Sequence, residues 1–169
     1  MTLGTHIVVA GAAGAVFIGN PIAGLFAAIV SHFVVDAIPH WDWPICSIEK
    51  TGERCTDGVV GNNKRAILRD FFIAGLDSFW GVVVLGLTAS YFNISIVSPW
   101  FIAVVIGGIL PDGLQFLYFL YRKEPLTTIQ RFHGFMHTNI KIPSERFIYG
   151  PLLQLPVVLI ALLVFFAVA

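Results

Sequence analysis

The sequence predicts an all-α polytopic membrane protein, a single transmembrane domain over residues 1–169 with about five helices. Of the 169 residues, 57% are hydrophobic and only 12% are charged, whereas a soluble domain carries about twice that charged share. A core of this size cannot bury so much apolar surface, so the natural solvent is a lipid bilayer. Two further observations agree: the apolar runs are long, and they contain no Lys or Arg.

The first two helices are expected to form a tight hairpin. Residues 6–19 are rich in Gly and Ala and give a helix of roughly 21 Å, which is short for a hydrocarbon layer of about 30 Å. Asn20 and Pro21 are a turn signal, and Pro suits the first position of a new helix. The second helix is expected over 21–38, because Pro39 cannot continue it.

Three more apolar runs predict the remaining helices. The fourth helix contains Gly107, Gly108 and Pro111, and we expect these residues to interrupt it, because Pro lacks the amide donor of the helical hydrogen bond. Broken helices at membrane depth occur where they line a cavity inside the protein. The expected ranges of the three helices are 70–92, 99–121 and 147–168.

The basic residues predict the orientation in the membrane. All Lys and Arg lie in two polar loops, residues 39–69 and 122–146, with five in each. In a five-helix chain these loops share one side, so the positive-inside rule puts both of them and the N-terminus in the cytoplasm, with the protein in the inner membrane. No cleavable signal peptide is expected, because His6 interrupts the first apolar run and no basic residue precedes it.

The charge balance and the cysteines say less about function. Ten acidic residues balance ten basic ones, so no nucleic-acid partner is expected; the oligomeric state stays open. Cys46 and Cys55 share one polar loop at a spacing that fits neither a CxxC motif nor a zinc knuckle. They are expected to be free thiols in the cytoplasm, or a disulfide if the loop faces an oxidising compartment.

Histidines and acids are spaced so that they meet at one depth. His32 and Asp36 are four residues apart and share a helical face, as His133 and His137 would on a helix. His6 begins the first helix on the same side of the membrane. These side chains are metal ligands and proton carriers, and such groups are costly in hydrocarbon.

Two deeper acids extend this set. Asp77 is ~12 Å inside the third helix from Arg69, and Asp112 is ~15 Å inside the fourth from Arg122, at 1.5 Å per residue. A mid-membrane Asp costs on the order of 2.5–3.5 kcal/mol, and several would repel one another unless a cation lay between them. A divalent metal, zinc or manganese, with one or two ions, meets this need. The predicted metal ligands are His6, His32, Asp36, Asp77, Asp112, His133 and His137.

His40 and Asp42 follow Pro39 beside two tryptophans, a pattern typical of a membrane interface. We expect them at the rim of the site, where one of them acts as a catalytic general acid or base. Arg131 or Lys141 is expected to hold a phosphate group.

The sequence contains four short motifs: Thr5-His6, Ser31-His32 with Asp36, Leu110-Pro111-Asp112, and His133-Gly134-Phe135-Met136-His137-Thr138. Together they resemble those of the membrane-bound metal-dependent hydrolases of bacterial inner membranes. In the family, the Leu-Pro-Asp element continues with a further Asp and a His, whereas here Gly113-Leu114-Gln115 follows and both are missing; the order of elements also differs. His40, Asp42 and Asp77 would then replace the missing ligands. The pairing of His and Asp four residues apart is also similar to that in helical zinc phospholipases C.

The resemblance implies a metal-dependent hydrolase. Its expected substrate is a phosphoester or lipid-type molecule reaching the cytoplasmic membrane face, with membrane lipid as the surrounding partner. Two other readings stay open: a non-enzymatic membrane protein that binds or transports divalent cations or protons, and a structural subunit whose His and Asp form a buried network without metal. The sequence contains neither an HExxH motif nor a P-loop.

Overall fold

The computed structural model describes residues 1–49, 58–138 and 149–169, and these are mostly helical, as an all-α class predicts. A short antiparallel hairpin, β1 with β2, is the one pair of strands among them. The elements are α1 (Leu3–Gly14), the 3-10 turn η1 (Ala15–Phe17), α2 (Pro21–Asp36), β1 (Ile48–Glu49), β2 (Val59–Val60), α3 (Lys64–Tyr91), α4 (Pro99–Tyr121), α5 (Leu126–Met136) and α6 (Tyr149–Val168).

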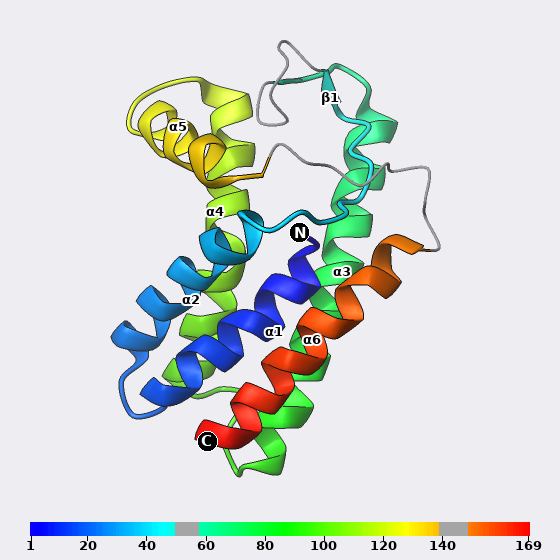
Figure 1. Ribbon diagram of the computed structural model, residues 1–169. Helices are drawn as coiled ribbons and strands as arrows, with labels where there is room; N and C mark the ends of the chain where they lie inside the picture. Colours follow the sequence, from blue (N-terminus) through cyan, green and yellow to red (C-terminus); the bar gives the residue numbers. More distant parts are fainter. Residues whose placement is uncertain (50–57, 139–148) are drawn as a thin grey trace.

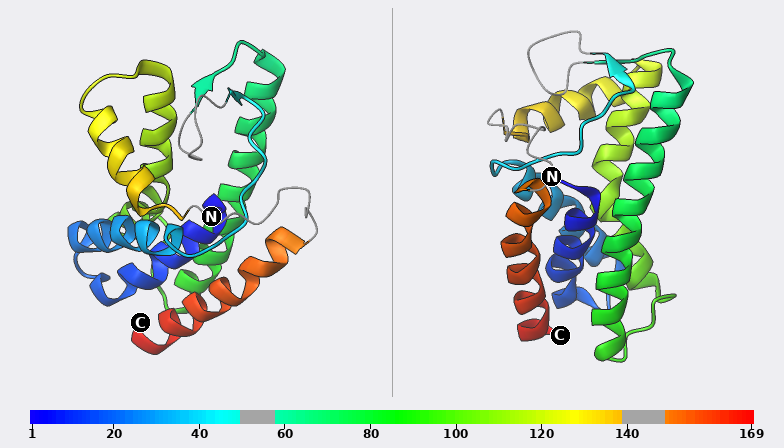
Figure 2. Two further views of the ribbon diagram at one scale, coloured as in Figure 1. Left: turned by 45° about the horizontal axis from the view of Figure 1, so that its top comes forward. Right: turned by 90° about the vertical axis from the view of Figure 1, so that its right-hand side faces the viewer.

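The helices form two layers. The long helices α3 and α4 make one layer, and α1, α2 and α6 lie across it (Figure 1; Figure 2, right). Helix α1 is the centre of the molecule, because it contacts α2, α3, α4 and α6. Helix α5 and the β hairpin lie at the end of the molecule beyond the C-terminal end of α2 and the chain's N-terminus (Figure 1).

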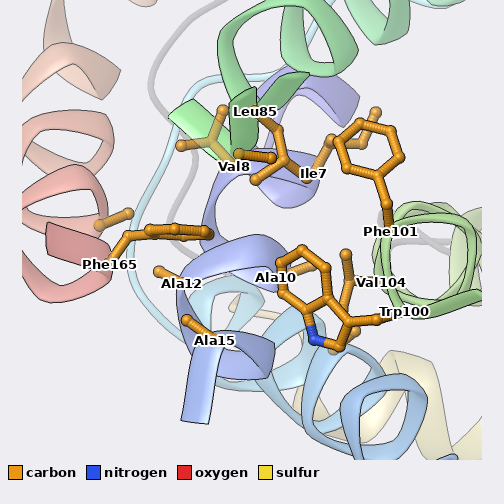
Figure 3. Packing of buried hydrophobic residues seen from close by; sticks show 13 residues of the cluster. Ile7, Val8, Ala10, Ala12, Ala15, Leu85, Trp100, Phe101, Val104 and Phe165 are labelled. Carbon is orange, nitrogen blue, oxygen red and sulfur yellow. The ribbon is translucent and has the colours of Figure 1, made fainter. Parts of the chain in front are cut away.

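The hydrophobic core surrounds α1. Figure 3 shows Ile7 and Val8 of α1 against Leu85 of α3, and Trp100 of α4 beside the alanines of α1. The indole nitrogen of Trp100 donates a hydrogen bond of 2.8 Å to the carbonyl of Gly14, which satisfies a polar group inside an otherwise apolar cluster. This core fixes the depth at which α1, α3 and α4 cross.

Glycines allow the helices to approach closely. A Cβ placed on Gly81 of α3 would lie 2.6 Å from the carbonyl oxygen of Gly4 in α1. A Cβ on Gly107 of α4 would lie 2.6 Å from Cβ of Ala28 and 2.8 Å from the carbonyl of Leu25, both in α2. Neither position has room for a larger side chain, so α1 and α2 can lie directly on the backbones of the long helices.

The fourth helix differs from its expectation. Helix α4 runs unbroken from Pro99 to Tyr121, with Pro111 inside it, so the predicted interruption is wrong. Gly107 and the neighbouring Gly108 serve close packing instead: a Cβ on Gly108 would lie 3.0 Å from that of Ala10. Neighbouring helices hold such a turn in place even though Pro removes one helical hydrogen bond.

Other boundaries also differ from the expected ranges: α1 begins at Leu3 rather than at residue 6, and α2 ends at Asp36 rather than at residue 38. Helix α3 begins at Lys64, six residues before the predicted start, because the side chain of Asn63 accepts hydrogen bonds from the amides of Arg65 and Ala66. Helix α5 lies in the segment predicted as a polar loop, and it packs on α4. Of the two cysteines, Cys46 is exposed, and Cys55 lies outside the described residues.

Membrane association is supported by length and by surface. Within the described ranges, α3 and α4 are the two helices long and apolar enough to cross a membrane, and the apolar parts of α1, α2 and α6 are shorter. Apolar side chains also remain on the surface: Ile22, Phe26 and Val30 are each more than half exposed at every fourth residue of α2. Such a stripe is typical of a surface that contacts lipid or another protein.

Candidate metal centre

The end of α2 carries the first two residues of the site. His32 is fully buried and Asp36, one helical turn later, is 1% exposed. Asp36 is the last residue of α2, and Ala37 caps the helix two residues before Pro39. The i, i+4 spacing puts both side chains on one face of α2, and their burial shows that this face points into the protein.

Asp36 is the hub of the site. Four histidines, from α1, α2, the segment after α2, and α5, turn their Nε2 atoms toward its carboxylate. His32 and His133 face oxygen Oδ2 at 3.2 and 3.1 Å. His6 and His40 face oxygen Oδ1 at 3.1 and 3.9 Å.

A second carboxylate completes one side of this cluster. Oδ1 of Asp112, in α4, lies 3.6 Å from Nε2 of His32 and 3.8 Å from Nε2 of His133. His32, Asp36, Asp112 and His133 offer ligand atoms that all lie within 4.8 Å of one another. The side chain of Asp112 is 30% exposed, so the cluster is reached from outside on this side.

A second group shares Asp36 with the first. Asp36, His40 and His137 also offer ligand atoms within 4.8 Å of one another. The rings of His40 and His137 are 4.9 Å apart at their centroids. His137 caps α5 in an extended conformation rather than continuing the helix, yet it stays 5.9 Å from the ring of His133. All five histidines of the sequence thus gather around one aspartate.

Main-chain carbonyls fix how these rings are oriented. Nδ1 of His32 lies 2.7 Å from the carbonyl oxygen of Gly108, and Nδ1 of His40 lies 2.7 Å from that of Ile38. A carbonyl only accepts, so each Nδ1 carries the hydrogen, and a neutral ring then has its lone pair on Nε2. As neutral rings, both histidines therefore aim their Nε2 lone pairs at carboxylates.

This arrangement fits a cation. A lone pair and a carboxylate oxygen are both acceptors, and they repel unless a proton or a metal ion lies between them. Among the described residues, Nε2 of His32 and Nε2 of His40 are buried without a hydrogen-bond partner of suitable geometry, and so is Nδ1 of His6. Imidazole and carboxylate are the ligand types that zinc and manganese take in proteins, so these residues could hold a divalent metal.

His6 lies beside the cluster. Its ring stacks on that of His32 with centroids 3.8 Å apart. It is not among the four ligand atoms of the first group, although its Nε2 contacts Asp36. The close approach of α1 to α3 and α4 places it there.

Asp42 and the amino group of Met1 lie together at the edge of the site. The amino group of Met1 lies 2.8 Å from Oδ1 of Asp42 and 3.0 Å from Oδ1 of Asp36, and Nε2 of His40 lies 3.2 Å from the Asp42 oxygen. Burial would raise the pKa of the Asp42 carboxyl, but His40 and the Met1 amino group hold that pKa well below its usual range. Asp42 is therefore a carboxylate at neutral pH.

Asp77 lies elsewhere. Its Oδ2 accepts a 2.9 Å hydrogen bond from the amide of Gly4, in the first turn of α1, where helix amides have no partner within the helix. No side chain of α1 itself fills this role, because Thr2 makes no capping hydrogen bond. Asp77 is absent from both groups of ligand atoms within the described residues, so the geometry gives it the role of capping α1.

Gln154 is a buried polar residue that sequence reasoning did not select. Its Oε1 accepts hydrogen bonds from the hydroxyls of Thr2 and Thr5 at 3.0 and 2.7 Å, and its amide donates to the carbonyl of Trp41 at 3.0 Å. It therefore joins α6 to the start of α1 and to the segment that carries His40. The signal was present: a lone Gln in an uncharged apolar helix normally bonds to a neighbouring helix.

The phosphate-binding residues find little support. Arg131 is exposed on α5. Lys141 lies outside the described residues.

Comparison with known proteins found no relative of this chain. A scan against protein-family models, a search of curated proteins and a search of solved structures each found no match to this chain. The resemblance to membrane-bound metal-dependent hydrolases stays a prediction from short motifs, and the site has to be judged by its geometry.

Proposed function

We propose that this chain is a membrane-embedded, metal-dependent hydrolase that cleaves a phosphoester at the cytoplasmic face of the inner membrane. One observation carries the proposal: histidine lone pairs, oriented by main-chain carbonyls, face the carboxylate of Asp36 in a buried site. A buried acceptor against a buried acceptor is unfavourable. Residues held in this way are more readily explained by a bound cation than by packing.

Protons alone are a poorer explanation. One proton could join one imidazole to one carboxylate oxygen. Four Nε2 atoms face Asp36, and His6 and His133 could each donate from Nε2 as a neutral ring, because no carbonyl holds their Nδ1 atoms. His32 and His40 carry the Nδ1 hydrogen, so each would have to become a cation to donate from Nε2, and buried charge is costly away from water.

The chemistry assigned to the site is hydrolysis. A bound divalent ion would polarise a phosphoryl oxygen and lower the pKa of a water molecule. The chain's own contribution is position and access: Asp112 and Asp42 each have a side chain that is 30% exposed, so a substrate can meet the buried histidines between them. The low pKa of Asp42 suits it to orient a water or a cation and makes it a weak proton acceptor. His40 faces both Asp36 and Asp42, and we assign it to the ligands rather than to the general acid.

The membrane placement is part of the same proposal. We place all five apolar helices in the bilayer, with the N-terminus and the two basic segments on the cytoplasmic side. The exposed stripe of α2 and the two long apolar helices support this placement. Asp36 is the last residue of α2, which puts the site at the cytoplasmic end of that helix in this placement, although Asp112 is nine residues, or about 14 Å, from the end of the longer helix α4. A phosphoester carried on a lipid or another amphiphile would reach it from there.

Metal content of the purified protein tests the proposal. Asp112→Asn removes a carboxylate from the first group, and Asp77→Asn is a matched control, because Asp77 caps α1. We expect wild type and Asp77→Asn to retain zinc or manganese, and Asp112→Asn to lose most of it. A wild-type protein without metal, or equal loss in the two variants, would contradict the metal site.

Activity is then measured with phospholipids and with generic phosphoesters. We expect the metal-loaded wild type to hydrolyse at least one of them, and Asp112→Asn to be at least about 100-fold slower, in line with loss of a metal ligand or its partners. Metal without hydrolysis across this panel, together with metal-dependent ion or proton flux in vesicles, would favour the transport alternative instead.

A further inference from the structure

The two oxygens of Asp36 face different partners. Oδ2 faces Nε2 of His32 and of His133, whereas Oδ1 faces Nε2 of His6 and of His40. A carboxylate that served a single ion would have no need of histidines on both sides. Carboxylates that divide their oxygens in this way are common in sites that hold two metal ions.

The Oδ2 side is the first ligand group. Asp112 joins His32 and His133 there, and Nδ1 of His32 is tied to the carbonyl of Gly108 at 2.7 Å. Helices α2, α4 and α5 all contribute, and α4 packs on both of the others. This side is therefore held by three helices.

The Oδ1 side is built in the same manner from other residues. His40 and His137 form the second ligand group with Asp36. The Nδ1 atoms of both rings face main-chain carbonyls, of Ile38 at 2.7 Å and of Thr138 at 3.1 Å, so neutral rings present Nε2 to a ligand. The amide of Thr138 also donates to the main-chain carbonyl of Asp36 at 2.9 Å, which ties the end of α5 to the end of α2.

Electrostatics also favour a cation on this side. Nε2 of His40 is buried between two carboxylates, 3.2 Å from Asp42 and 3.9 Å from Asp36. A positive group already lies there, because the amino group of Met1 contacts both carboxylates. A metal ion bound by His40 and His137 would also neutralise the negative charge of these two carboxylates.

We propose that Asp36 bridges two divalent cations, one held with His32, Asp112 and His133 and the other with His40 and His137. This inference rests on the metal dependence in the proposed function and makes its centre dinuclear. Two divalent ions and the Met1 amino group against the carboxylates of Asp36, Asp42 and Asp112 leave two positive charges, which suits an anionic substrate such as a phosphoester. Paired ions stabilise both the attacking and the leaving oxygen of a phosphoryl group.

The test counts ions and asks whether they are coupled. The full chain is loaded with Mn²⁺, freed of excess metal, and examined by elemental analysis and electron paramagnetic resonance. We expect about two ions per chain in wild type, with the spectrum of a magnetically coupled pair. The double variant His40→Ala/His137→Ala should keep about one ion with an uncoupled spectrum, and His133→Ala should also lose about one. Asp36→Asn should lose the coupling, and Asp77→Asn should keep both ions.

The outcomes separate the two proposals. About one ion in wild type, or an unchanged count in the His40→Ala/His137→Ala variant, overturns the bridge, and hydrolysis by that protein leaves the proposed function standing. Two coupled ions without hydrolysis of any phosphoester would support the bridge and contradict the proposed function. Thermal unfolding of each variant shows whether a lost ion reflects a lost ligand or a lost fold. The milder change His137→Gln is a second check. A folded His137→Gln variant that keeps the coupled pair also overturns the bridge.

Discussion

The packing of α4 on α2 should control metal binding, and Gly107→Ala tests this. The added Cβ would lie 2.6 Å from Cβ of Ala28 and 2.8 Å from the carbonyl of Leu25. Neither neighbour can turn away, because one is a backbone atom and the other is attached directly to the backbone. The two helices must therefore separate, and they carry Asp112 on one side and Asp36 on the other.

The matched control is Gly113→Ala in the same helix, where an added Cβ meets nothing within 4 Å. Both changes gain about 1 kcal/mol of helix propensity, so this gain cancels in the comparison. Overpacking costs typically about 1–3 kcal/mol. At about 2–4 °C per kcal/mol for a chain of this size, Gly107→Ala should melt about 2–12 °C below Gly113→Ala.

Metal affinity supplies the second readout. Because the carbonyl of Gly108 orients His32 and moves with α4, Gly107→Ala should weaken metal binding by about 10–100-fold, the range found for groups that position ligands. The assays are thermal unfolding in detergent and titration of the metal-free protein against a competing chelator. Equal melting temperatures and equal affinities in the two variants would refute the close packing of α4 on α2 as the support of the site.

Three further predictions concern the metal, the rim and a helix cap. Chelation should lower the melting temperature, because metal at 100 times its Kd stabilises by about 2.7 kcal/mol; an unchanged midpoint would count against a bound ion. The pKa of Asp42 is lowered in the fold, so its stabilisation is complete above the unfolded pKa of about 3.9 and is lost as the pH falls below that value. Between about pH 6 and pH 3, the melting temperature should therefore fall less for Asp42→Asn than for wild type. Identical dependence of the melting temperature on pH would contradict this. Asn63→Ala should destabilise the protein by about 1 kcal/mol, because two amides of α3 lose their cap; chemical denaturation measures it, and no change would mean that water replaces the cap.

The starts of α2 and α4 were predictable from the sequence, because their signals are local. Asn20 caps α2 by accepting from the amide of Ala23, and Pro21 occupies the first turn. Ser98 and Pro99 begin α4 in the same way. Polar sequence concealed the start of α3, since Lys64 and Arg65 look like loop residues until Asn63 is seen to cap them.

The site was predictable where two residues share a helix. His32 and Asp36 lie four apart, and this spacing alone puts both on one face. Depth was a poorer guide for Asp77, because distance along a helix does not say in which direction around the helix a side chain points. The amide of Gly4 uses that carboxylate instead. His40 illustrates the opposite error: it was expected at the rim, and the structure places it 5% exposed beside Asp36.

The sequence by itself determined that this protein is helical and strongly apolar, where α2 and α4 begin, and which side chains are too costly to bury without a partner. Those properties depend on neighbouring residues and on transfer free energies, which composition and spacing carry. Only the tertiary structure decided that all five histidines meet at Asp36, that its two oxygens face separate sets, and that Asp77 caps α1. These are directions set by helices crossing at glycines, and contacts between residues as far apart as Asp36 and His133 arise only when those helices pack.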